Sequence, residues 1–250
     1  MPWLLRSTPT LLLSEMSRTS KKLLSERLSA IAESLPVGGV VCDVGSDHGI
    51  LPLYLLQNNL ADRVIVTDLN DQPLARGKAA IEEAGFSKNA RFFLTDGILA
   101  VLQEKVDHFV IAGMGGETIL GILSRAAEKI PVGTNFFLQP MTKIQQLRRY
   151  LYENGFCITD ERLVYENKKY FVIISALFDG IKRYKADLIY EFGEFLPNQK
   201  GSVSVSYHRS ALDKLNLKIR GMICGSLDCS FEMEMKHFLE EVLGNHYENS

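Results

Sequence analysis

The architecture follows from residues 40–49, VVCDVGSDHG, and from the way the flanking segments continue this stretch. Its first half is a short apolar run rich in β-branched residues, which is typical of a buried parallel strand. A carboxylate and two glycines come next, and residues 50–56, ILPLYLL, then favour a helix. Strand, glycine turn and helix together form the first half of a nucleotide-binding α/β unit.

The same alternation of strand and helix repeats along the chain as far as residue 153. After the first strand, we predict strands at 63–67, 91–94, 107–112 and 135–140, and helices at 21–35, 72–84, 117–129 and 144–153. Two strands, 156–165 and 169–177, then follow with only a three-residue turn between them. Five strand–helix units closed by a β-hairpin predict an α/β fold with a Rossmann-like, seven-stranded mixed sheet, parallel except for its last strand. This is the core architecture of class I S-adenosylmethionine-dependent methyltransferases, whereas a plain dinucleotide-binding dehydrogenase usually lacks the closing hairpin.

We expect three parts along the chain. Residues 1–19 form an N-terminal extension, which is either disordered or follows from an upstream start codon with Met16 as the true beginning. The apolar run there is too short and too interrupted by proline for a secretory signal. Residues 20–180 form the methyltransferase domain. Residues 181–250 form a small C-terminal helical hairpin domain, with a linker at 192–197 and helices at 203–223 and 231–243.

The composition excludes several classes of protein. Of the 250 residues, 46% are hydrophobic and 23% are charged, which is ordinary for a globular protein. No apolar run approaches the ~20 residues needed to span a bilayer. The four cysteines lack the paired spacing of a zinc site and fit a reduced, cytoplasmic protein. The net charge of -2 offers no global attraction for nucleic acid.

Carboxylates stand at three successive strand ends, where ligands of open α/β sheets bind. A single carboxylate there is as often a helix cap or part of a solvated turn, but Asp43, Asp68 and Asp96 at one edge favour a ligand site. Asp68 is placed to accept both hydroxyls of a ribose, and Asp96 is placed to accept the amino group of an adenine. The predicted cofactor-binding residues are Asp43, Gly45, Ser46, Gly49, Asp68, Leu69, Asp96, Gly97, Gly113 and Met114.

The glycine turn itself favours a cationic cofactor. It lacks the Gly-x-Gly-x-x-Gly pattern needed for a pyrophosphate, because Asp47 stands where a middle glycine would be. A negative side chain there repels a dinucleotide phosphate and suits the sulfonium of S-adenosylmethionine, with no metal. A lone histidine is more often structural than catalytic, but the position of His48 beside Asp47 favours a function. Asp47 and His48 are therefore the candidate catalytic residues.

These motifs together resemble the TrmK family of bacterial tRNA (adenine(22)-N(1))-methyltransferases. The resemblance is carried by residues 43–52 (DVGSDHGILP), 96–97 (DG), 111–116 (IAGMGG) and 138–140 (LQP). It extends from about residue 20 to residue 177 and continues more weakly into the C-terminal helices. The resemblance implies a Rossmann-like catalytic domain with a C-terminal coiled coil, S-adenosylmethionine as cofactor, and methyl transfer to N1 of an adenine in the D-arm region of tRNA.

The chain departs from the family pattern at two places. The family usually has Ala-Tyr where this chain has Gly49-Ile50, so an aromatic side chain that could contact the target base is absent. The family also commonly has Asn after Gln-Pro, where Met141 stands here. Both departures bear on the positioning of the base more than on the binding of the cofactor.

Positive charge for a tRNA partner is local. Residues 200–220 contain five Lys or Arg against a single Asp, and Lys143, Arg148 and Arg149 accompany the helix after the fifth strand. A solvated helix face is the alternative explanation for both groups. The Gly113–Gly116 turn either is only a tight turn or forms a backbone-lined substrate pocket. The predicted substrate-binding residues are Gly115, Gly116, Gln139, Pro140, Lys143, Arg148, Arg209, Lys214 and Lys218.

Two other functions remain open from the sequence. The chain could methylate a small molecule or a protein, in which case cofactor binding would persist and tRNA would fail as substrate. It could instead be a non-catalytic RNA-binding module that has kept the fold, as the loss of the aromatic at Ile50 would allow. No membrane partner and no obligate protein partner is implied.

Overall fold

Seven strands form one mixed sheet in the order β3-β2-β1-β4-β5-β7-β6 in the computed structural model. The structure describes residues 24–248, apart from the side chains of Asp47 and of residues 246–248. The predicted extension at 1–19, the alternative start at Met16, and the beginning of the helix predicted at 21–35 lie outside the described residues. The strands are β1 (Val40–Val44), β2 (Arg63–Asp68), β3 (Ala90–Leu94), β4 (His108–Met114), β5 (Asn135–Pro140), β6 (Phe156–Glu166) and β7 (Lys169–Phe178).

The topology confirms the predicted fold class. Strands β1 to β5 pair in parallel, and β7 runs antiparallel to both β5 and β6. The β6–β7 hairpin turns through Asn167 and Lys168, whose φ angles of 50° and 61° are those of a type I′ turn. Since β1 lies between β2 and β4, the chain reverses its direction of sheet growth at the carboxyl end of β1, which is where open α/β sheets bind ligands.

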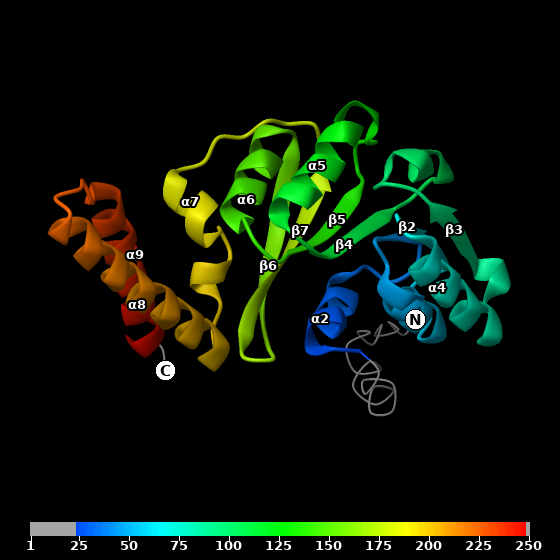
Figure 1. The fold of residues 1–250 in the computed structure, drawn as a ribbon, viewed down its shortest axis with the longest axis horizontal. Coiled ribbons are helices and arrows are strands. Elements are labelled where there is room, and N and C mark those ends of the chain that lie inside the picture. The colour runs from blue at the N-terminus through cyan, green and yellow to red at the C-terminus, as the bar shows by residue number, and fades with distance from the viewer. Residues whose placement is uncertain (1–23, 249–250) are drawn as a thin grey trace, which may run out of the picture.

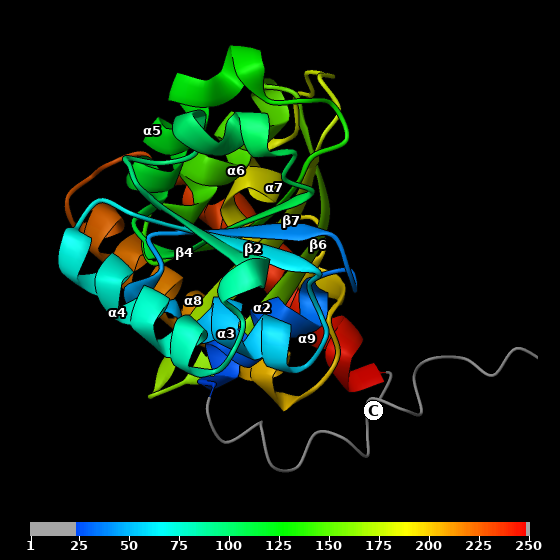
Figure 2. The same ribbon diagram turned by 90° about the vertical axis from the view of Figure 1, so that its right-hand side faces the viewer.

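Helices cover both faces of the sheet, as Figures 1 and 2 show. One face packs against α5 (Gly116–Ala126) and α6 (Ile144–Glu153), and the other packs against α2 (Glu26–Ser34), α3 (Ile50–Gln57) and α4 (Asp71–Glu83). In β1, Val40 and Val44 face the first layer and Val41 faces the second, as the alternation of a strand requires. Burial of β1 on both faces explains why its sequence is apolar apart from Asp43.

Helix α2 begins at Glu26 and not near residue 21 as predicted. Ser25 is the reason, because its backbone is extended and its hydroxyl accepts a hydrogen bond from the N–H of Leu28 at 3.3 Å. A serine in this conformation is a favoured N-cap, and it marks the first turn of the helix. The buried face of α2 is short and consists of Ala30, Ile31 and Ala32.

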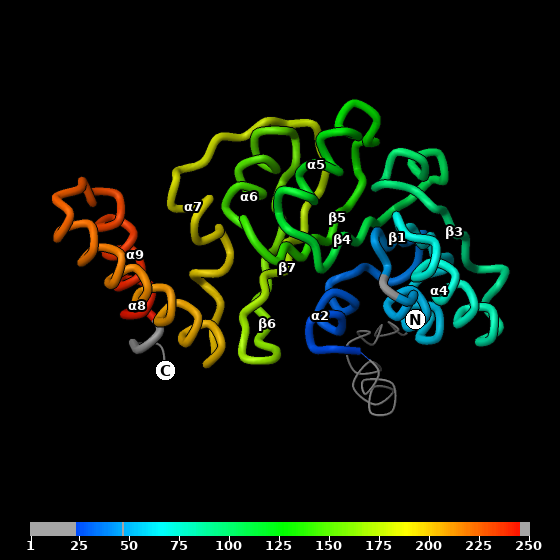
Figure 3. The backbone as a smooth tube through the Cα atoms, viewed as in Figure 1, coloured from blue at the N-terminus to red at the C-terminus, as the bar shows by residue number. Residues whose placement is uncertain are grey.

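The two predicted C-terminal helices are present as α8 (Ser202–Cys224) and α9 (Ser230–Glu248). They lie side by side at the end of the molecule that is remote from β3 (Figure 3). Their contact buries Leu215 and Ile219 of α8 against Met235 and Leu239 of α9, and Phe192 joins the same cluster. The apolar stripes that neither helix could bury alone are thereby covered.

The segment predicted as a linker is packed against the sheet layer. Helix α7 (Asp187–Phe192) and the 3-10 turn η6 (Leu196–Asn198) place Tyr190 and Leu196 in the core that also contains α5 and α6. Tyr190 is 3% exposed and Leu196 is wholly buried. The linker prediction for 192–197 is therefore wrong, and the sheet core extends past the boundary predicted at residue 181.

None of the helices in residues 24–248 is both long and apolar enough to cross a membrane. All four cysteines lie in this part of the chain and are free thiols. The described side chains include no group of three or more His, Cys, Asp or Glu arranged to hold a metal ion.

Candidate active site

The turn between β1 and α3 is fixed to the end of β2. The N–H groups of Gly45 and Ser46 both donate to the carbonyl of Thr67, at 2.8 and 3.2 Å. Gly45 has a φ of +70°, and a Cβ atom there would lie 2.1 Å from the methyl carbon of Met114 at the end of β4. The positive φ favours glycine at this position, and the contact with Met114 shows that the structure brings these two predicted cofactor residues together.

A second glycine contact was not predicted. Gly49, with a φ of +66°, lies against the backbone of Gly77 in α4, where a Cβ on Gly49 would come within 2.9 Å of the Cα of Gly77. A Cβ on Gly77 would in turn lie 3.0 Å from the N atom of Gly49. Helix α4 therefore supports the glycine turn by direct backbone packing. A glycine inside a helical sequence pattern was the available signal.

Asp43 is a buried carboxylate with no basic partner in the described part of the chain. Its residue is 7% exposed, and no described side chain forms an ion pair with it. The pKa of Asp43 is raised from 3.8 to about 6, mainly by burial and also by the neighbouring Asp68, while the Ser46 hydroxyl acts to lower it. A cationic ligand would offset the cost of burying this charge, so the site fits a sulfonium or ammonium group.

The other two strand-end carboxylates differ in exposure. Asp68 is buried, and its Oδ1 accepts the N–H of Asn70 at 2.8 Å, so that Oδ2 can accept from a ligand hydroxyl. Asp96 is exposed and its Oδ1 lies 3.0 Å from Nη2 of Arg125 in α5, a pairing that was not predicted. Leu69 beside Asp68 is 67% exposed and offers an apolar surface at the same edge. Gly97 is buried against Ile122.

The substrate half of the edge is more enclosed than predicted. Gly116 is buried, and its N–H donates to the carbonyl of Thr142 at 2.9 Å. Gln139 is wholly buried, and Pro140 is buried beside it. The side chain of Gln139 accepts the N–H of Gly113 at 3.2 Å and donates to the carbonyl of Pro140 at 2.9 Å. We therefore correct the prediction that Gly116, Gln139 and Pro140 contact the substrate: they support the site, because their polar groups are used inside the protein. Gly115, in contrast, is only partly buried.

Arg27 of α2 also reaches this edge, and sequence reasoning missed it. Its Nη1 donates to Oε1 of Gln139 at 2.7 Å and lies 3.5 Å from the sulfur of Met141. The two residues are far apart in the sequence, and an arginine on an amphipathic helix gives no sign of such a contact. The structure thereby adds a cation to the carboxyl ends of β4 and β5.

Arg148 is the clearest correction among the predicted tRNA-binding residues. It is 1% exposed, and its Nε donates to Oε1 of the buried Glu161 at 2.7 Å. Its Nη1 donates to the carbonyls of Tyr190 and Glu191 at 3.1 and 2.8 Å. A polyanion cannot reach the Arg148 side chain. Arg148 instead attaches α7 to the sheet.

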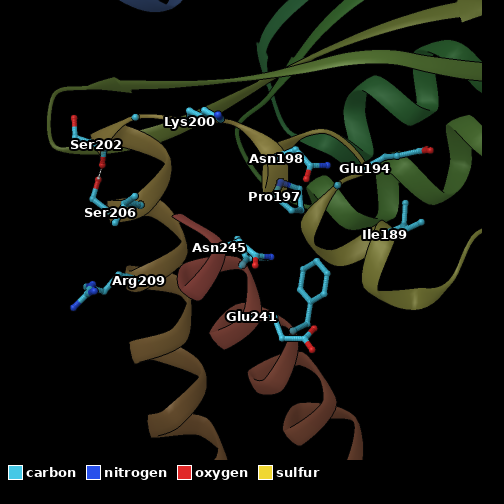
Figure 4. Close-up of a pocket in the computed structure, with 15 residues that line it drawn as sticks. Ile189, Glu194, Pro197, Asn198, Lys200, Ser202, Ser206, Arg209, Glu241 and Asn245 are labelled. Atoms are coloured by element: carbon cyan, nitrogen blue, oxygen red, sulfur yellow. Dashed lines mark hydrogen bonds between the residues drawn. The ribbon is translucent and has the colours of Figure 1, made fainter. Parts of the chain in front are cut away.

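The other predicted basic residues lie on the surface. Lys143 is exposed at the start of α6, and Arg209, Lys214 and Lys218 are exposed on α8. Lys218 forms an ion pair with Glu232 of α9 at 2.7 Å. A pocket of about 810 Å³ lies between the α7–η6 segment and the two C-terminal helices (Figure 4). Arg209 stands at its α8 wall and Glu241 at its α9 wall.

The candidate catalytic residues lie in the 3-10 turn η2 (Asp47–Gly49). His48 is partly buried and has left-handed backbone angles, with φ 62° and ψ 8°. The side chain of Asp47 lies outside the described part of the structure. Ile50 and Met141, where the chain departs from the family pattern, are 42% and 43% exposed, so both offer flexible aliphatic surface where an aromatic or an amide would stand.

The fold and this edge define a class I methyltransferase, and comparison with known proteins agrees. Residues 24–174 match the model of a methyltransferase domain family. The tRNA (adenine(22)-N(1))-methyltransferase of Bacillus subtilis is 31% identical over 187 residues, which cover 72% of this chain and 77% of that protein.

Solved structures extend the match into the C-terminal helices. The crystal structure of the B. subtilis m1A22 tRNA methyltransferase TrmK is 27% identical, with a TM-score of 0.73, and the match covers 88% of this chain and 98% of that one. A Streptococcus pneumoniae structure in complex with S-adenosyl-L-methionine is 25% identical, with a TM-score of 0.76, over 88% of this chain and 99% of that one. The chain belongs to the TrmK family of tRNA methyltransferases.

Proposed function

We propose that this protein transfers the methyl group of S-adenosylmethionine to N1 of an adenine in tRNA, with adenine 22 as the target that the B. subtilis relative suggests. The main structural support for this cofactor is the environment of Asp43. This carboxylate is buried at the glycine turn and has no basic partner in the described structure. The choice of tRNA as the substrate is supported by the similarity to B. subtilis TrmK.

The chemistry demands placement more than a strong base. When bound, S-adenosylmethionine supplies a methyl group on a positively charged sulfur, which is already activated and needs no metal. The N1 lone pair of adenine is nucleophilic as it stands, so the protein must hold it in line with that methyl group. N1 loses its lone pair to the new N–C bond, the C–S bond breaks toward sulfur, and the positive charge moves to the methylated base.

Different residues carry out different parts of this work in the proposal. Asp43 faces the cationic cofactor, and Gly45 with Met114 forms the surface against which it lies. Asp68 binds the ribose and Asp96 the adenine of the cofactor. Asp47 stabilises the charge that develops on the target base, and His48 orients that base. Asp43, Gly45, Ser46, Gly49, Asp68, Leu69, Asp96, Gly97, Gly113 and Met114 make up the proposed cofactor site.

The tRNA partner requires further contacts. A base that is paired within tRNA must be extruded before its N1 atom is accessible. The exposed cations proposed to contact phosphates are Lys143 near the edge and Arg209, Lys214 and Lys218 on α8. They lie on two separate elements. A tRNA substrate also agrees with the cytoplasmic location that the unpaired cysteines predict.

Methylation of total tRNA followed by nucleoside analysis tests the proposal directly. The expected product is N1-methyladenosine, formed only when S-adenosylmethionine is present. Cofactor binding without transfer to tRNA would refute the substrate and favour a small molecule or a protein. A titration that detects no binding of S-adenosylmethionine would refute the enzyme and favour a non-catalytic RNA-binding module.

The catalytic assignment has its own test. Asp47→Ala and His48→Ala should each slow single-turnover methyl transfer to tRNA, while the affinity for S-adenosylmethionine changes less than the rate. Full single-turnover activity in both variants would show that neither residue has the assigned role.

A further inference from the structure

Arg27 reaches the methyl-transfer edge from a helix that precedes the whole Rossmann-like sheet. Its Nη1 donates to Oε1 of Gln139 at 2.7 Å, and the N–H of Gly113 donates to the same oxygen at 3.2 Å. A Cβ atom on Gly113 would lie 3.6 Å from this Nη1. The guanidinium therefore lies directly beside the residue that precedes Met114, the residue in contact with Gly45 of the cofactor turn.

The positive charge of Arg27 has no acidic partner among the side chains that the structure describes. No described carboxylate forms an ion pair with it, and the nearby Glu166 accepts the backbone N–H of Arg27, at 2.9 Å, on its Oε2. The guanidinium carbon lies 5.4 Å from the centre of the Phe171 ring. Its Nε is buried and makes no hydrogen bond. A partly buried guanidinium with a neutral amide, a thioether and an aromatic ring as neighbours retains donors for an anion.

Arg162 shows that this arrangement is not simply how arginines attach α2 to the sheet. It lies on β6, and its Nη1 donates to the carbonyl of Ala30 and to Oε2 of Glu33, both at 3.2 Å. Its charge is thus paired on the same helix. Arg27 and Arg162 both hold α2 against the sheet, but only Arg27 reaches the edge where the strands end.

We propose that Arg27 binds an oxyanion of the reactants during methyl transfer and is a positioning residue for the proposed reaction. The inference rests on the proposed function, which supplies two sources of such an anion. One is the carboxylate of the methionine part of the cofactor, and the other is a phosphate next to the extruded nucleotide. Both match the planar fork of a guanidinium.

Gln139 makes this binding favourable. It fixes one side of the guanidinium before the ligand arrives, so that little side-chain freedom is lost on binding. It also explains why a wholly buried glutamine lies at a substrate edge, because Gln139 acts through Arg27 and Gly113 without contacting the ligand.

The test compares Arg27→Met and Arg27→Lys with Arg162→Met as the matched control. Methionine keeps the aliphatic stem and the contact with Phe171 and removes the charge, whereas lysine keeps the charge and loses the fork. Calorimetric titrations use S-adenosylmethionine and 5′-methylthioadenosine, which lacks the amino-acid carboxylate. Filter binding to unmodified tRNA is measured as a function of salt, and the KM for tRNA and kcat are determined separately.

If Arg27 binds the carboxylate of the cofactor, Arg27→Met should weaken S-adenosylmethionine binding by about 10- to 100-fold. The affinity for 5′-methylthioadenosine and the salt dependence of tRNA binding should not change. If Arg27 binds a tRNA phosphate, the cofactor affinity should not change and the KM for tRNA should rise. The slope of log affinity for tRNA against log salt concentration should become smaller by about 0.7 to 0.9. Arg27→Lys should recover part of either loss.

Effects of Arg27→Met on all ligands no larger than those of Arg162→Met would overturn the proposal, because both residues would then only hold α2. If Arg27→Met does not fold, Arg27→Lys is judged by the same ligand-specific pattern. Failure of the wild-type protein to methylate any tRNA would refute the proposed substrate, yet it would leave the comparison of S-adenosylmethionine with 5′-methylthioadenosine as a valid test of Arg27.

Discussion

Two buried carboxylates in this protein have opposite surroundings. Glu161 on β6 is 1% exposed and receives Nε–H of Arg148 at 2.7 Å and the N–H groups of Glu194 and Phe195 at 2.9 and 3.3 Å. Asp43 on β1 is 7% exposed, and the side chains that affect its charge are the hydroxyl of Ser46 and a second carboxylate, Asp68. The first acid is satisfied by the protein, and the second is not.

This difference separates structural from functional burial. Removing a charge from water is costly unless a partner compensates it, and at Glu161 the partner is built into the fold. Gly193 allows the chain to approach this carboxylate closely, because a Cβ atom there would clash with Oε2 of Glu161. At Asp43 no such partner exists among the described side chains of residues 24–248, and in the proposed function the cationic cofactor supplies the compensation. The same reasoning, with the sign of the charge reversed, applies to Arg148 and Arg27.

The largest effect is expected from breaking the satisfied pair. Arg148→Met leaves Glu161 charged and buried, so the free energy of unfolding should fall by about 3–5 kcal/mol. Chemical denaturation measures this, and the folded variant should bind S-adenosylmethionine with unchanged affinity. Arg149→Met is the control, since its ion pairs with Glu153 and Asp187 are exposed and should matter by less than about 1 kcal/mol. Equal losses in both variants would contradict the contrast.

Neutralising the unsatisfied acid should have the opposite effect on stability. Asp43→Asn removes a buried charge, so the free protein should become more stable at pH 7, by an amount on the order of 1–3 kcal/mol. The affinity for S-adenosylmethionine should nevertheless fall by about 10- to 100-fold. Denaturation and calorimetry on the same samples test both parts, with the exposed Asp160→Asn as control. A variant with lower stability and unchanged cofactor affinity would show that Asp43 is structural.

The same carboxylate predicts a pH dependence. Its pKa is raised from 3.8 to about 6, so the free folded protein holds the proton more tightly than the unfolded chain. Its stability should fall as the pH rises from 3.8 to about 6 and should lose nothing more from this group above that. A cationic cofactor prefers the ionised form, so its affinity should fall by up to about tenfold per pH unit below the raised pKa. Titrations at several pH values, with Asp43→Asn as a flat reference, would expose a different titrating group.

Packing at the glycine turn should matter less. Gly77→Ala places a Cβ atom 3.0 Å from the N atom of Gly49, which should cost about 1–3 kcal/mol through overpacking and weaken cofactor binding several-fold. Gly221→Ala in α8 is the matched control, because nothing lies within 4 Å of a Cβ there. Helix propensity predicts that the control gains up to about 1 kcal/mol. A stabilised Gly77→Ala variant would show that α4 can retreat from the turn.

The smallest effect is expected on the C-terminal helices. Lys214 has no ion pair in the described structure, whereas Lys218 is paired with Glu232. Lys214→Gln should therefore reduce tRNA affinity about two- to fivefold at low salt and lower the salt slope by about 0.7 to 0.9. Lys218→Gln should do less, since part of its charge is already compensated. Binding curves at several salt concentrations measure both, and the reverse order would place the tRNA on another face.

Much of this molecule was predictable because its signals are local. The apolar run at residues 40–44, the glycine turn after it and the closing hairpin each depend on neighbours in sequence, and all are present, although the hairpin turn has two residues and not the predicted three. The same holds for α8 and α9, whose apolar stripes required a partner helix. Arg27, Gly77 and the packed α7–η6 segment were missed, because each depends on residues that are distant along the chain.

The sequence alone determined the succession of strands and helices, the closing hairpin and the strand ends at which the carboxylates stand, because periodicity and turn chemistry depend on short stretches of chain. Tertiary structure alone decided the partner of each buried charge. It paired Arg148 with Glu161, where the sequence had assigned Arg148 to tRNA, and it gave Asp43 and Arg27 no oppositely charged partner among the described side chains. A side chain's charge is written in the sequence, but its compensation depends on which distant groups the fold brings within about 4 Å.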